Sequence, residues 1–123
     1  MTPTTLVSGG RPAAREAAIA AALDPSVQTA VILEGIASGN GHLESKDNTD
    51  ALRVLRIAPG CMCCVGNLTL RVTLNRLLRK PPSRLFIALS TSTHLAQIRN
   101  FLCTEPYDTF LTLTEDMTLM DAI

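Results

Sequence analysis

The stretch TTLVSGGRPAAREAAIAAAL, residues 4–23, predicts a strand, a tight turn and a helix in that order. Residues 4–8 form a short β-rich run that ends at a pair of glycines. Pro12 suits the first turn of a helix, alanine dominates the residues after it, and Asp24-Pro25 ends the segment. This order is typical of the opening of a fold in which strands and helices alternate.

The remainder of the chain continues this alternation. Compact apolar runs predict further strands, and amphipathic runs bounded by capping residues or prolines predict helices. Strands are expected at 29–33, 52–58 and 84–90 and at the end of the tail 109–123, and helices at 67–80 and 93–102. The alternation implies right-handed crossovers and an α/β fold, a mostly parallel β-sheet with flanking helices in one three-layer domain, residues 1–123.

The segment 67–80 carries two patterns at once. Its apolar residues alternate over 68–74 as in a strand, while several of its leucines fall on one helical face. We favour the helix, because Asn67 can cap its start and Pro81-Pro82 ends it.

Composition excludes several classes of function. The chain has 123 residues, of which 46% are hydrophobic and 18% charged, as in a globular protein with an aliphatic core. Only 3% are aromatic, too few for the stacking platforms that bind single-stranded nucleic acid. We see no charged leader and no apolar run long enough to span a membrane. We therefore expect a cytoplasmic protein that binds neither nucleic acid nor membranes.

Three of the four cysteines stand close together in the stretch PGCMCCVGN, residues 59–67. Because cytosolic thiols stay reduced, such a group favours metal binding or catalysis over a structural disulfide. Cys61, Cys63 and Cys64 offer soft thiolate ligands, which suit Zn²⁺ or Cu(I). Zinc takes four ligands, so three cysteines leave one position open. The candidates for it are Cys103, His94 and His42, and the sequence does not choose between them.

Two other interpretations use the same cysteines. Cys61 and Cys64 form a C-x-x-C pair ahead of a predicted helix, an arrangement that lowers a thiol pKa and is typical of redox sites. Alternatively, the cysteines are small buried hydrophobic residues without a chemical role.

The charges are divided along the chain although their total is zero. Residues 1–50 carry a net charge of −3, residues 51–104 a net charge of +8 with no acidic residue, and residues 105–123 a net charge of −5. One interpretation is a basic face beside an acidic one. The other is that arginines around the cysteines favour their thiolate form.

The order strand, glycine turn, helix, and then Gly-Cys-x-Cys-Cys after a third strand resembles the nucleotide-binding domain of the CobW-type GTPases. These are relatives of the urease and hydrogenase nickel-insertion GTPases. The resemblance runs from about Thr4 to Ala122 and includes the terminal TLMDA; it leaves the family's C-terminal domain absent. It implies a P-loop NTPase-like fold, a transition metal, often zinc, at the cysteine motif, and GTP turnover that drives metal delivery to a client metalloprotein.

The nucleotide motifs of that family do not match. A P-loop reads G-x-x-x-x-G-K-[ST], and GRPAAREA, residues 10–17, stands in its place. Arg15 replaces the lysine and could contact a phosphate, whereas Glu16 replaces the metal-binding hydroxyl and would repel one. We therefore interpret Gly9, Gly10, Arg15 and Glu16 as a vestigial phosphate loop. Leu89 and Ser92 replace the family's Glu-x-x-Gly, and no guanine-reading motif exists.

The sequence therefore predicts a zinc-binding relative of the CobW-type metallochaperones that does not hydrolyse GTP. Its partner would be a client metalloprotein or a second copy of itself. The alternatives are a metal chaperone that still binds or hydrolyses GTP, a thiol redox switch, and a protein-interaction remnant. Glu34 is expected to be solvated or to assist a helix cap.

Overall fold

The computed structural model describes residues 2–24, 26–34, 52–57, 68–89 and 95–119. The elements follow in the order β1 (Thr2–Gly9), α1 (Pro12–Ala22), β2 (Thr29–Glu34), β3 (Leu52–Ile57), α2 (Leu68–Leu77), β4 (Arg84–Ala88), α3 (Leu95–Leu102), α4 (Tyr107–Phe110), β5 (Leu111–Leu113) and β6 (Met117–Leu119). Within these residues, every helix is too short or too polar to cross a membrane. The predicted alternation of strands and helices is confirmed.

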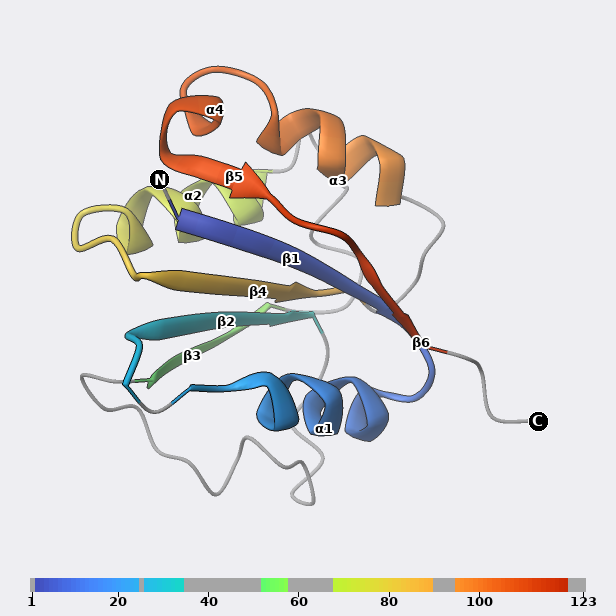
Figure 1. Ribbon diagram of the computed structural model, residues 1–123. Helices are drawn as coiled ribbons and strands as arrows, with labels where there is room; N and C mark the ends of the chain where they lie inside the picture. Colours follow the sequence, from blue (N-terminus) through green and yellow to red (C-terminus); the bar gives the residue numbers. More distant parts are fainter. Residues whose placement is uncertain (1, 25, 35–51, 58–67, 90–94, 120–123) are drawn as a thin grey trace.

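The strands form a six-stranded sheet in the order β3-β2-β4-β1-β5, and β6 also pairs with β1 (Figure 1). All the pairings are parallel. β5 pairs with the start of β1 and β6 with its end, so the two short strands lie on the same side of β1. Since all strands point the same way, they end at one edge of the sheet, which we call the carboxyl edge.

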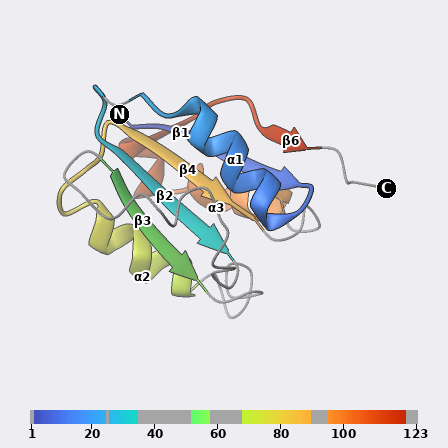
Figure 2. The ribbon, with the colours of Figure 1, turned by 90° about the horizontal axis from the view of Figure 1, so that it is seen from below.

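Helices cover both faces of this sheet, as expected for a three-layer α/β fold (Figures 1 and 2). α1 lies on one face, and α2, α3 and α4 lie on the other. Successive strand residues point to opposite faces, so each strand contributes to two cores. The core beneath α1 contains Val7, Ile19, Val31, Leu33, Leu52, Phe86 and Ala88. The core on the other face contains Leu6, Ile32, Leu85, Ile87 and the apolar residues of α2 and α3.

The segment with two patterns is a helix. α2 buries Leu70, Leu74 and Leu77 completely or almost so, whereas Val72 is 50% exposed. In a strand, Val72 would share a face with Leu70 and Leu74, so the helical period explains the burial pattern. The interpretation of residues 67–80 as a helix is confirmed for Leu68–Leu77.

The tail contains more structure than the sequence predicts. β6 confirms the strand expected in the tail, but α4 and β5 were not predicted. α4 has four residues and β5 has three, which is too short for a hydrophobic period to appear. α4 is held by Tyr107, which is buried and whose hydroxyl lies 3.0 Å from the Asn75 side chain on α2.

We expect Leu74→Ala to lower the free energy of unfolding by about 2–5 kcal/mol, because it leaves a cavity in the core beneath α2. Val72→Ala on the same helix removes an exposed side chain and should change the stability by less than about 0.5 kcal/mol. Urea unfolding followed by circular dichroism measures both. Equal losses for the two variants would contradict the orientation of α2.

Candidate functional site

Several predicted site residues lie outside the described residues, namely Cys61, Cys63, Cys64, His42 and His94. The elements on either side of them are described. β3 ends at Ile57 on the carboxyl edge, and α2 begins at Leu68 (Figure 2). His94 directly precedes α3, which also begins on that side of the sheet (Figure 1). The metal, redox and buried-cysteine interpretations of these residues therefore stay predictions.

Cys103, a candidate fourth ligand, is described and is exposed as a free thiol. It follows the last residue of α3, and its amide donates to the carbonyl of Arg99. α3 runs back from the carboxyl edge, so Cys103 lies roughly one helix length, about 12 Å, from the start of α3. Within the described part of the chain, no three His, Cys, Asp or Glu side chains are grouped so that they could hold a metal.

The glycine turn joins β1 to α1 at the carboxyl edge. Gly9 and Gly10 have φ angles of +80° and +66°, a conformation that favours glycine. A Cβ on Gly9 would lie 2.1 Å from the carbonyl oxygen of Leu119. The backbone of β6 therefore packs directly against this turn and leaves no room for a side chain there.

Arg15 turns back onto the glycine turn. Its side chain is buried, with 4% exposure, and Nη1 donates to the carbonyl oxygens of Gly9 at 3.1 Å and Gly10 at 2.7 Å. The guanidinium thus neutralises the partial negative charge of two carbonyls at the turn. Arg15, which the sequence predicts to stand where a P-loop has its lysine, binds the backbone of the glycine turn.

Glu16 makes an ion pair with β3. Its carboxylate is 3% exposed, and Oε1 lies 3.5 Å from Nη2 of Arg56, one residue before the end of that strand. A buried carboxylate is costly unless a cation compensates it, and Arg56 provides that compensation. The pair therefore joins α1 to the strand that precedes the cysteine stretch.

The sequence did not indicate that two polar residues at the carboxyl edge, Ser8 and Glu34, are buried. Ser8 is fully buried at the end of β1, and its Oγ has no hydrogen-bond partner among the residues that the structure describes. Glu34 ends β2 and is 6% exposed, so the expectation that it is solvated is wrong, and the alternative that it assists a helix cap stays a prediction. By strand alternation, Ser8 shares the face of Leu6 and Glu34 the face of Ile32, the face that carries α2 and α3.

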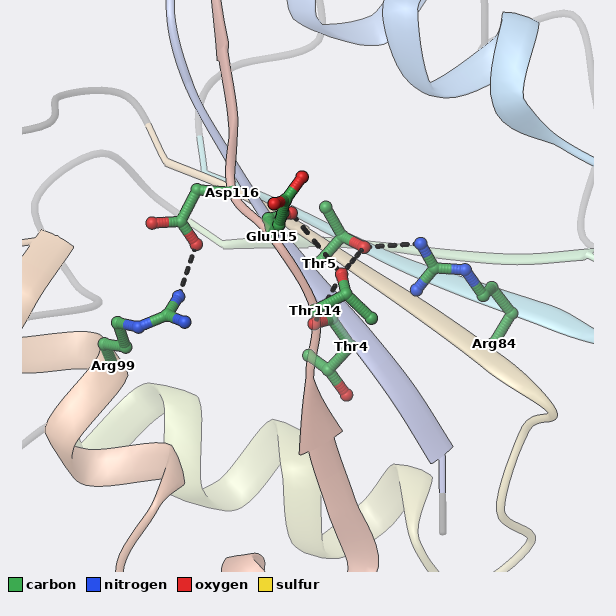
Figure 3. Close-up of polar contacts among 7 residues, drawn as sticks. All are labelled: Thr4, Thr5, Arg84, Arg99, Thr114, Glu115 and Asp116. Atoms are coloured by element: carbon green, nitrogen blue, oxygen red, sulfur yellow. Dashed lines mark hydrogen bonds and ion pairs between the residues drawn. The ribbon is translucent and has the colours of Figure 1, made fainter.

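A group of polar contacts fastens the segment between β5 and β6 (Figure 3). The hydroxyls of Thr5 and Thr114 lie 2.5 Å apart, and Arg84 also donates to Thr5. On the other side of the segment, Nη1 of Arg99 lies 2.5 Å from Oδ1 of Asp116. Partial burial lowers the pKa of the Arg84 guanidinium, which stays charged at neutral pH. These contacts hold β6 in place beside the glycine turn.

The comparisons with known proteins agree with the predicted resemblance. The chain is 31% identical over 126 aligned positions to the zinc chaperone YeiR of Escherichia coli (strain K12). The alignment covers 98% of this chain and 38% of that protein, so the chain spans about two fifths of the length of the curated relative it matches. No protein-family model and no solved structure matches the chain. The similarity supports a CobW-like relationship.

We expect Gly9→Ala to lower the free energy of unfolding by about 3 kcal/mol or more, because both the positive φ and the Leu119 carbonyl oppose a Cβ. Gly10→Ala is the matched control. Its φ is also positive, but its nearest contact would be the Leu119 Cβ at 3.2 Å, so we expect a loss of about 1–2 kcal/mol. Denaturant unfolding compares the two, and a larger loss for Gly10→Ala would contradict the packing of β6 on the turn.

Proposed function

We propose that this chain binds zinc through Cys61, Cys63 and Cys64 and acts as a metallochaperone that passes the metal to a client protein. The observation that carries the proposal is the 31% identity to a zinc chaperone, which extends over 98% of the chain. The α/β sheet supports it, because segments that leave the carboxyl ends of parallel strands are where such folds place their binding groups.

The chemistry of the donors fits zinc as cargo. Three thiolates within four positions provide three of the four ligands that zinc takes, and thiolate sulfur is a ligand that zinc prefers. A weak or exchangeable fourth ligand favours release of the metal from such a site. The proposal therefore needs only a donor that lies near the carboxyl edge.

For the fourth ligand we propose His94 rather than Cys103. His94 directly precedes Leu95, where α3 begins on the same side of the sheet as the end of β3 (Figure 1). Cys103 follows the opposite end of α3 and is exposed. Cys103 therefore lies about one helix length from the side of the sheet at which β3 ends.

We further propose that the chain does not hydrolyse GTP. Phosphoryl transfer relies on a cation and a magnesium ligand at the phosphate loop. Arg15 donates to the carbonyls of Gly9 and Gly10, and Glu16 pairs with Arg56. Arg15 and Glu16 therefore both have partners within the chain. A carboxylate at position 16 would also repel a phosphate that approached the turn.

The metal proposal is tested by zinc titration of the reduced protein against a chromogenic chelator. We expect one zinc per chain for the unaltered protein and for Cys103→Ser, because the exposed thiol is not a ligand in this proposal. A triple variant with serine at 61, 63 and 64 should lose the bound zinc, since a neutral hydroxyl is a poor zinc ligand. His94→Ala should bind zinc more weakly, by about tenfold or more.

Zinc binding that survives the triple variant would refute the cysteine site. Loss of binding in Cys103→Ser, together with unchanged binding in His94→Ala, would reverse the assignment of the fourth ligand. Circular dichroism of each variant separates loss of a ligand from loss of the fold.

The nucleotide proposal is tested by calorimetry with GTP and Mg²⁺, with an active P-loop GTPase as the positive control. We expect no binding heat from this chain at about millimolar GTP. The binding free energy of GTP would then be weaker than about 4 kcal/mol. Heat that appears with the unaltered protein and disappears in Arg15→Ala would contradict the proposal and favour a GTP-dependent chaperone.

A further inference from the structure

One side of the molecule carries a cluster of cationic side chains on and beside α2, which we call the α2 basic surface. It consists of Arg53, Arg71, Arg76, Arg79 and Lys80. Four of them are exposed, and Arg53 is half-buried on the neighbouring edge strand, where its Nη2 donates to the carbonyl of Lys80. Arg71 and Arg76 lie on α2, and Arg79 and Lys80 follow in the turn directly after its last residue.

These cations have no acidic partner within the described residues. The other arginines of the basic segment are engaged. Arg56 pairs with Glu16 and Arg99 pairs with Asp116. Arg84 donates to backbone carbonyls and to Thr5. On the α2 basic surface no ion pair forms among the residues that the structure describes. Like charges that stand close together repel each other, and an acidic partner would remove that repulsion.

Apolar contacts are available within and beside this surface. Val72 follows Arg71 on α2 and lies one turn before Arg76; it is 50% exposed, one of two large hydrophobic side chains described as exposed. A depression of about 390 Å³ lies between α2 and the segment from α3 to α4, and its lining also includes Thr104 and Glu105. Arg71 and Asn75 line one wall, and Phe101 and Tyr107 form the other with the segment between them. The Arg71 guanidinium lies over the Phe101 ring at 5.4 Å, at the boundary between the cations and this depression.

From this arrangement we infer that the α2 basic surface is a docking site for an acidic protein segment that carries apolar anchor residues. Carboxylates would pair with these cations, one apolar side chain would cover Val72, and another would enter the depression. Interfaces of this kind combine charge pairs at their rim with a few apolar anchors at their centre.

The charge balance favours a different acidic chain over a second copy. The exposed carboxylates among the described residues are scattered over the fold. Asp24 follows α1, Glu105 and Asp108 lie at the start of α4, and Glu115 stands between β5 and β6. Of the exposed carboxylates that the structure describes, only Glu105 and Asp108 lie close together in sequence, and two acids do not balance five cations. A nucleic acid is less well matched, because the exposed apolar side chain of Val72 would contribute nothing to binding a phosphate backbone.

This inference does not depend on the proposed metal site, and its test needs no metal. The probe is a fluorescein-labelled peptide of about 18 residues that repeats Glu-Glu-Leu, measured by fluorescence anisotropy with the whole chain. We expect saturable binding at about 50 mM salt that weakens by about tenfold or more at about 500 mM, because salt screens the charge pairs. A peptide with lysine in place of glutamate should not bind.

Charge reversal locates the site. Arg76→Glu should weaken peptide binding by about tenfold or more, whereas Arg11→Glu should change it by less than about twofold. Arg11 is exposed at the start of α1, on the opposite face of the sheet. Both variants change the net charge by the same amount, so a difference between them reports the position of the charge. Val72→Ala should weaken binding of the Glu-Glu-Leu peptide but not of a peptide of glutamate alone. Circular dichroism verifies that each variant folds.

Three outcomes would overturn the inference. The first is an absence of binding by the acidic peptide at about 50 mM salt. The second is an equal effect of Arg76→Glu and Arg11→Glu, which would show only an effect of net charge. The third is that a DNA duplex of similar length binds more tightly than the acidic peptide and that Arg76→Glu abolishes this DNA binding. That result would assign the surface to nucleic acid.

Discussion

The parallel pairing of β1 with β4 and of β4 with β2 is the constraint on which the other features depend. These three strands are buried on both faces, so their register is fixed by two cores at once. Because the strands are parallel, each returns through a crossover, and all of them end at one edge. The glycine turn after β1 and the segments that follow Glu34, Ile57 and Ala88 therefore leave the sheet at a common edge.

At that edge, other residues of the chain fill the space beside the glycine turn and donate to its carbonyl oxygens. The Leu119 carbonyl occupies the space beside Gly9, and the Arg15 guanidinium binds the turn's carbonyls. The contacts of Thr114 and Asp116 hold β6 where it can make that close approach. A turn that is filled in this way has less need of a ligand to order it. This supports the proposal that the glycine turn does not bind a nucleotide.

The elements could be predicted where residues in sequence interact with one another, and not where the partner is distant. Residues 4–23 show their strand, turn and helix because capping, proline and periodicity act within one turn or one strand. The requirement for glycine at position 9 depends on Leu119, which lies 110 positions away. The burial of Ser8 and Glu34 likewise depends on the helices packed over the strand ends. Glu34 was expected to be solvated or to assist a helix cap, and its burial at the end of β2 contradicts the first of these expectations.

The charged residues show the same difference between what local sequence reveals and what depends on distant partners. The sequence shows that residues 51–104 hold eight bases and no acid, but it does not show which bases are used inside the fold. The structure divides them: Arg56 and Arg99 neutralise carboxylates from other segments, and Arg84 stacks on Phe86 at 4.2 Å. The bases that are left belong to α2 and its neighbours, and they face outward around an exposed apolar side chain. Folding has no need for exposed like charges gathered on and directly after one short helix, so their arrangement is better explained by recognition of a partner.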